Sequence, residues 1–221
     1  MQSTPAVRMG LSVAVATGLY GISFGALSVA AGLSVAQTQA LSLLMFTGGS
    51  QFAFVGAIGG GGAAALVSAS LLGVRNMVYG AQMNTMFAPQ GPRKLVQAHV
   101  TIDESVACAV GQDDADEQAR GFWTGGVGVF LLWNLFTLAG AVLGNALGDP
   151  KAWGLDGAAT AAFLGLLWPR LHNRDTVTIG VAAAFVTLLL VPVLPQGLPL
   201  LVAAAVAAAV ATTLRRKEAT T

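Results

Sequence analysis

The longest uncharged stretch of the sequence limits what this chain can fold into. Between Arg8 and Arg75, 66 consecutive residues include no Asp, Glu, Lys, Arg or His. About 20 apolar residues are enough to cross a bilayer as a helix, so this stretch holds two crossings and most of a third. Of the whole chain 55% is hydrophobic and 10% charged, whereas soluble domains are roughly 25% charged. The sequence therefore predicts a helical membrane protein and excludes an ordinary soluble domain.

Further uncharged stretches lie between Arg120 and Asp149, between Asp156 and Arg170, and between Asp175 and Arg215. Gly and Pro clusters divide the apolar sequence, because both residues interrupt helices. We expect an all-α, polytopic bundle of about seven transmembrane helices in a single permease domain, 1–221. The expected spans are 10–33, 37–58, 63–87, 121–147, 155–169, 175–194 and 197–214. The span 155–169 is short, which favours a discontinuous helix.

The segments between the spans are expected to lie at the membrane surface. Residues 88–120 are interpreted as a partly inserted segment followed by an acidic cytoplasmic loop, and 215–221 as a short cytoplasmic tail. Short cytoplasmic loops collect Lys and Arg. Seven spans with the tail inside place eight basic residues in the cytoplasm and leave only Arg8 and Lys151 outside, so the sequence predicts N-out, C-in.

Small residues recur along two of the expected spans. In the first span they are separated by three or four positions and share one helix face; they are Ala14, Gly18, Gly21, Gly25, Ser28 and Gly32. In the fourth span Gly140, Gly144 and Gly148 form two overlapping GxxxG steps. Membrane helices approach closely through such residues, so a compact bundle is expected.

Arg75 falls at the midpoint of the expected span 63–87. A charge near the bilayer centre costs at least about 2.5–3.5 kcal/mol, so it is usually paired, hydrated or functional. One interpretation is a cation facing a wet cavity with Asn76 and Tyr79 beside it, where a guanidinium can bind a carboxylate. The other is a structural anchor bonded to carbonyls or to Asp103 or Glu104.

The second expected span contains Gly48, Gly49, Ser50 and Gln51 at its middle. Paired glycines followed by hydrogen-bonding side chains are typical of a point where a membrane helix opens. An opened helix exposes backbone N–H groups and a positive dipole end that attract an anion. A continuous helix that packs closely at the glycines is the alternative.

Adjacent carboxylates, Asp103 and Glu104, follow the third span. Their mutual repulsion favours retention of a proton, which makes them candidates for proton coupling; a solvated helix end is the alternative. Two His and one Cys are too few for an ordinary metal site, and the sequence has none of the common hydrolase or nucleotide-binding motifs. We therefore expect neither an enzyme nor a cofactor, and the net charge of +1 gives no indication of nucleic-acid binding.

Several segments in order resemble the AzlC family of branched-chain amino acid exporters. They are 21–25 (Gly-Ile-Ser-Phe-Gly), 47–52 (Thr-Gly-Gly-Ser-Gln-Phe), Arg75 with Tyr79, Asp103 with Glu104, Trp133, Thr137, Gly140, Gly144, 154–156 and 162–167. The resemblance covers roughly residues 8 to 190. It implies a permease of the bacterial cytoplasmic (inner) membrane that exports hydrophobic amino acids with a small AzlD-type membrane subunit of about four spans.

The chain departs from the family at two places near the expected site. A Pro usual before the Phe-Gly of the first span is absent, and an Asn-x-Arg-His pattern in the third span is replaced by Gly73, Val74, Arg75 and Asn76. These changes leave the substrate open to differ from leucine, isoleucine and valine.

The leading hypothesis is a secondary transporter, coupled to protons, in which Gly48 to Gln51 and Arg75 bind the substrate carboxylate. Phe24, Met45, Phe46 and Phe52 would form an apolar wall for the side chain. A channel-like facilitator and a structural subunit of a transport complex are the alternatives. An inverted repeat, common in transporters, also remains open, because the halves share no motif that we can align.

Overall fold

The computed structural model describes residues 4–60, 63–147, 164, 167–168, 171–194 and 198–218. All regular secondary structure in these residues is helical, as the sequence predicted. Two helices, Pro5–Ala30 and Ala115–Ala146, are long and apolar enough to cross a membrane. The expected span 155–169 and the tail residues 219–221 lie largely or wholly outside the described residues.

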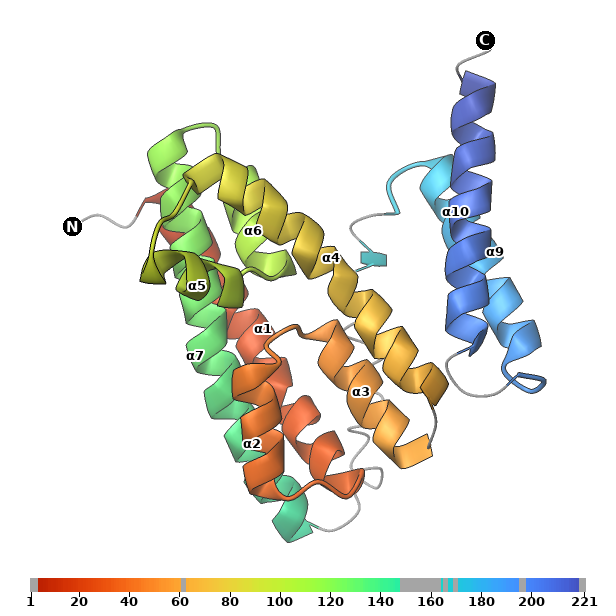
Figure 1. Ribbon diagram of the computed structural model, residues 1–221, viewed down its shortest axis with the longest axis horizontal. Coiled ribbons are helices and arrows are strands. Elements are labelled where there is room, and N and C mark those ends of the chain that lie inside the picture. The colour runs from red at the N-terminus through yellow and green to blue at the C-terminus, as the bar shows by residue number, and fades with distance from the viewer. Residues whose placement is uncertain are drawn as a thin grey trace.

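Helices α1 (Pro5–Ala30) and α7 (Ala115–Leu147) form the central pair of the fold. Residue numbers rise together along the two helices where they touch: Gly10 lies against Thr124, Gly18 against Leu132, and Ala26 against Gly144. The two helices are therefore parallel (Figure 1). Most of the predicted small-residue face lies in this contact, because Ala14, Gly18, Gly21, Gly25 and Ser28 are buried, whereas Gly32 is exposed beyond the end of α1. Gly148 lies outside the described residues.

Helix α4 (Ala63–Phe87) has the predicted bounds of the third span and is antiparallel to α1 and α7 (Figure 1). Its middle lies beside Ser50 and Asp103, and its last turns contact Phe122 near the start of α7. We call the end of the molecule where α1 and α7 begin the starting end, and the opposite one the far end.

The second expected span, 37–58, is two helices. Helix α2 (Val35–Leu44) runs from the far end towards the middle of α7. Gln39 donates a hydrogen bond to Asn134, and Phe46, after the end of α2, contacts Phe130, which is nearer the start of α7. The chain breaks at Met45 to Gly48, where Gly48 has a φ of +62°. Helix α3 (Gly49–Gly60) then returns to the far end, where α4 begins (Figure 1). This first hairpin confirms the predicted opening at the glycines, but it does not cross the fold.

A second hairpin enters from the starting end. It consists of α5 (Pro92–His99) and α6 (Asp103–Val110), the segment expected to be partly inserted. Ser105 lies beside Gly126 and Cys108 beside Gly121, so α6 runs against α7 and back to the starting end. Only the first hairpin replaces an expected crossing, the span 37–58, which is why α1 and α7 are parallel. The predicted alternation of successive spans, in which the first and fourth are antiparallel, is wrong at this point.

The starting end gathers residues that the predicted topology separated. Arg8 lies near the start of α1, Arg93 and Lys94 follow α4, and Arg120 lies near the start of α7. Placing Arg8 on the opposite side from the other three is therefore a second error of the sequence prediction, and it follows from the first.

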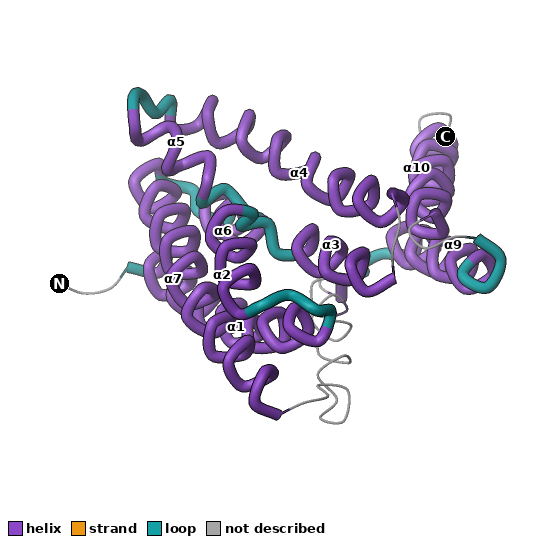
Figure 2. Tube along the Cα trace, turned by 60° about the horizontal axis from the view of Figure 1, so that its bottom comes forward, coloured by secondary structure: helices purple, strands orange, loops and turns teal. Residues whose placement is uncertain are grey.

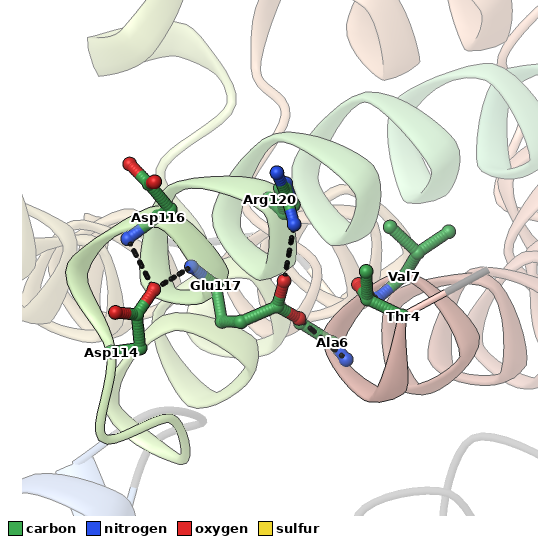
Figure 3. A network of polar contacts seen from close by, with 7 residues as sticks. All are labelled: Thr4, Ala6, Val7, Asp114, Asp116, Glu117 and Arg120. Carbon is green, nitrogen blue, oxygen red and sulfur yellow. Dashed lines mark hydrogen bonds and ion pairs between the residues drawn. The ribbon is translucent and has the colours of Figure 1, made fainter. Parts of the chain in front are cut away.

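Glu117 ties the two helix starts together (Figure 3). Its carboxylate accepts from the backbone N–H of Ala6 at 3.4 Å and from the guanidinium of Arg120 at 2.6 Å. Asp114 accepts from the backbone N–H groups of Asp116 and Glu117, which caps α7. Free N–H groups at a helix start favour such carboxylates.

Helices α9 (Arg174–Leu190) and α10 (Leu198–Glu218) form a pair to one side of the other helices (Figure 1, Figure 2). Asn173 caps α9 by accepting from the N–H of Thr176 at 2.8 Å. Helix α10 contacts α4 and runs in the same sense as α4 in Figure 1.

Candidate functional site

The tips of the two hairpins meet halfway along α7. Phe46 at the first tip packs against His99 at the second, with ring centroids 6.1 Å apart. Both rings contact Phe130, near the middle of α7. Helices α3 and α6 therefore start close to one level, and their first turns point positive dipole ends at the centre of the fold.

Gln51 braces the opening of the first hairpin. Its Oε1 accepts from the backbone N–H of Gly48 at 3.1 Å, and its Nε2 donates to the carbonyl of Leu41 at 3.3 Å. The side chain thus satisfies the Gly48 N–H after the break and adds a second donor to the Leu41 carbonyl before it, which also accepts from the Met45 N–H. Gln51 is fully buried, as is Ser50, whose Oγ has no hydrogen-bond partner among the described residues.

Arg75 and Asp103 form an ion pair at this level. Arg75 Nη1 lies 2.6 Å from Asp103 Oδ2, and the two side chains are 32% and 13% exposed. The pair joins the middle of α4 to the first residue of α6. It corresponds to the second interpretation of Arg75, the anchor bonded to a carboxylate. Even so, Arg75 Nε and Asp103 Oδ1 are buried without a hydrogen-bond partner among the described residues, so each ion keeps capacity for a ligand.

The ion pair adjoins the start of α3. A methyl group built on Gly73 would lie 3.6 Å from Ser50 Oγ, and Gly73 precedes Arg75 by two residues. Asn76 is half-buried, and its Oδ1 also has no partner among the described residues. The structure therefore brings the first turn of α3, the middle of α4 and the start of α6 together.

An aromatic cluster adjoins the Arg75 and Asp103 ion pair. Tyr20 stacks on Phe52 with ring centroids 5.5 Å apart and meets Trp133 edge-on at 5.0 Å. Phe24 contacts Phe52 and Trp133 at 5.4 and 5.7 Å. Tyr20 also lies within electrostatic range of Arg75, Asp103 and Glu104. Of the expected apolar wall, Phe24, Phe46 and Phe52 belong to one core cluster.

The remaining expected site residues lie further from this centre. Tyr79 is half-buried and packs with Met83 and Phe122 in a second core cluster towards the starting end. Met45 lines an apolar surface groove of about 360 Å³ with Leu41 and Phe54. Glu104 is half-buried in the first turn of α6, next to Asp103.

Sequence reasoning missed Tyr20, Trp133 and Thr137 as site residues. Trp133 Nε1 and Thr137 Oγ1 are buried without a hydrogen-bond partner among the described residues, and a methyl group on Gly21 would lie 3.3 Å from that hydroxyl. The sequence did carry a signal for Trp133 and Thr137. They are four positions apart on α7, and they lie against the glycine-rich side of α1. Such buried polar groups usually bind water or a ligand.

This arrangement suits a small zwitterion. The unpartnered carboxylate oxygen of Asp103 can accept from an ammonium group. Arg75 and the N–H groups of Gly49 and Ser50 at the start of α3 can donate to a carboxylate. Within the described residues no cluster of three or more potential metal ligands occurs.

Comparison with known proteins gives one match. A family model described as AzlC protein matches residues 12–147, which include α1 through α7 except for the first turns of α1. No curated protein and no solved structure matches the chain.

Proposed function

We propose that this chain, which belongs to the AzlC family, is a secondary transporter that exports branched-chain or other hydrophobic amino acids. The family is associated with branched-chain amino acid transport. The Arg75 and Asp103 pair carries the proposal, because a monodentate ion pair with free groups on both partners lies where two helix starts meet. A permease rather than an enzyme fits this site, which holds opposite charges for the two ends of an amino acid.

The proposed membrane topology follows the hairpins. Helices α1, α4, α7, α9 and α10 cross the bilayer with the predicted span 155–169, and the two hairpins enter from opposite faces. With the starting end in the cytoplasm, nine of the eleven Lys and Arg lie inside, and only Arg75 and Lys151 do not. The positive-inside rule thus supports N-in and C-in, replacing the predicted N-out.

Exposed apolar residues support the membrane assignment. On α1 they recur at every fourth position, Leu11, Val15 and Leu19, each about half exposed. On α7 Leu131, Leu135 and Val142 are more than half exposed. Such a face is stable against lipid and costly in water. The proposed location is the bacterial cytoplasmic (inner) membrane, with an AzlD-type small subunit as partner.

Glu104 is the proposed proton carrier, with Asp103. It lies beside the ion pair and interacts electrostatically with both Asp103 and Arg75. A carboxyl group next to another carboxylate and in a partly dry site retains a proton more readily than a solvated one. Protonation from one side and release to the other would couple export to the proton gradient.

Amino acid uptake into inside-out membrane vesicles tests the function. Vesicles from cells expressing the chain in its native background should accumulate leucine, and Arg75→Gln should reduce this to background at unchanged membrane abundance. Arg93→Gln is the matched control, because Arg93 is exposed on α5. Normal uptake by Arg75→Gln would remove Arg75 from the mechanism.

Proton coupling is measured in the same vesicles. Glu104→Gln should abolish accumulation against a gradient but retain exchange of labelled for unlabelled leucine. Equilibration of leucine across the vesicle membrane, with no accumulation under an imposed pH gradient, would favour the uncoupled facilitator instead.

A further inference from the structure

The two hairpins belong to a repeated arrangement. Residues 5–60 contain a long helix, a short helix, a break and a second short helix, and residues 63–110 contain the same order. The first copy comprises α1, α2 and α3, and the second α4, α5 and α6. Because α4 runs against α1 and the hairpins enter from opposite ends, the copies are inverted relative to each other (Figure 1). Inverted repeats place transporter sites at their interface.

The breaks match residue by residue. Thr47 to Gln51 align with Thr101 to Ser105, 54 positions later, and in both copies the second helix starts at the third residue of this segment. Gly49 then corresponds to Asp103, Ser50 to Glu104 and Gln51 to Ser105. Only the Thr is shared, which is why the sequence alone revealed no repeat.

One hydrogen bond repeats although the residue types differ. Gly48 donates its backbone N–H to Gln51 Oε1 at 3.1 Å, and the equivalent Ile102 donates its N–H to Ser105 Oγ at 3.0 Å. The other contacts go to carbonyls at positions that are not equivalent: Gln51 Nε2 donates to the carbonyl of Leu41, whereas Ser105 Oγ lies 2.8 Å from the carbonyl of Val100 and 3.0 Å from that of Ile102. Gln51 and Ser105 are both fully buried.

We infer that Gln51 and Ser105 are equivalent positioning residues that hold the starts of α3 and α6 open in two inverted copies of one unit. The inference rests on the proposed function, because it assigns each copy one end of the substrate. Gln51 holds the α3 turn with the unpartnered Ser50 hydroxyl, which receives the carboxylate. Ser105 holds the α6 turn with the unpartnered Asp103 oxygen, which receives the ammonium.

This assignment changes the role of Gln51. Its carbonyl oxygen and one amide hydrogen are engaged by the backbone on the two sides of the break. Ser50, its neighbour, keeps a free hydroxyl at the same helix start. Substrate contact therefore falls to Ser50 and the backbone N–H groups, and Gln51 acts through them.

Competition by leucine and two of its analogues in the vesicle assay separates the roles of the two copies. Leucinamide lacks the carboxylate, 4-methylpentanoate lacks the ammonium, and leucine carries both. Gln51→Met removes both hydrogen bonds at similar volume, and we expect half-inhibition by leucine and 4-methylpentanoate to need at least tenfold higher concentration, with leucinamide unchanged. Ser105→Ala should weaken leucine and leucinamide tenfold and leave 4-methylpentanoate unchanged.

Conservative variants distinguish positioning from general damage. Ser105→Thr keeps the hydroxyl and should restore the wild-type pattern. If Gln51→Met is lost from the membrane, Gln51→Glu, which keeps an acceptor for Gly48, should show the same selectivity change.

The failures differ for the two proposals. No uptake of leucine or of any other hydrophobic amino acid by the wild-type chain would overturn the proposed function. Wild-type uptake with variants that weaken all three ligands alike, or none of them, would overturn only the positioning roles.

Discussion

A single methyl group at Gly25 tests the packing on which the site depends. A Cβ at this position would collide with the Thr137 carbonyl and lie 2.6 Å from the Ala141 nitrogen. Ordinary contact begins at 3.4 Å, and the obstructing atoms are backbone, which cannot rotate away. Helices α1 and α7 must therefore separate along much of their length, and a gap of about 0.5–1 Å already forfeits a quarter to a half of each dispersion contact.

The expected cost of Gly25→Ala is about 3 kcal/mol, at the upper end of overpacking changes. Gly80→Ala is the matched control, because no described atom lies within 4 Å of its added Cβ. There the gain in helix propensity of about 1 kcal/mol should prevail. Thermal unfolding in detergent should show a Tm lower by roughly 6–12 °C for Gly25→Ala, and an equal or higher Tm for Gly80→Ala. Equal midpoints for the two variants would refute the close parallel contact of α1 and α7.

Two further predictions concern charges. Asp103→Asn leaves Arg75 without its partner and should destabilise the protein by about 2–3 kcal/mol, a low value for a broken ion pair because the guanidinium is one-third exposed. Adding Arg75→Gln should recover most of this loss in the same detergent unfolding assay. Additive losses from the two substitutions would contradict the pairing. Hydrogen bonds from Thr4, Arg120 and Ala6 hold the pKa of Glu117 below its ordinary value of 4.5. A group with a depressed pKa stabilises the fold at neutral pH, and this stabilisation is lost as pH falls below about 4.5. Glu117→Gln should therefore lower Tm at pH 7 and differ less from the wild type at pH 3.5. A Tm difference that is the same at both pH values would contradict this role of Glu117.

The sequence predicted the helical class and several local features of the helices correctly. The bounds 63–87, the small-residue face of α1 and the opening at Gly48 are all present. These features depend on local composition and periodicity, which a single sequence displays directly. Glycine at 48 also has a backbone reason, because its φ of +62° suits a residue without a Cβ.

Topology was not predictable in the same way. An apolar run such as 37–58 has the length of a span, and its hydropathy is the same whether it crosses or turns back at its middle. The sense of α1 relative to α7 is decided by contacts between residues more than one hundred positions apart, such as Ala6 with Glu117. Counting basic residues then placed Arg8 on the opposite side from Arg93 and Arg120, because that count inherits every error in the number of crossings.

The distribution of charge between the two inverted copies gives the site its polarity. The first copy has Gly49 and Ser50 where the second has Asp103 and Glu104, so the two helix starts, alike in backbone, differ in the charge that they carry. The dipole at α3 is left for a ligand's anion, whereas acidic side chains already occupy the one at α6 and turn it towards cations. Arg75 neutralises one of those acids from the side. A symmetric pair of hairpins would bind a symmetric ligand, and in the proposed transporter this difference at two positions orients a zwitterion instead.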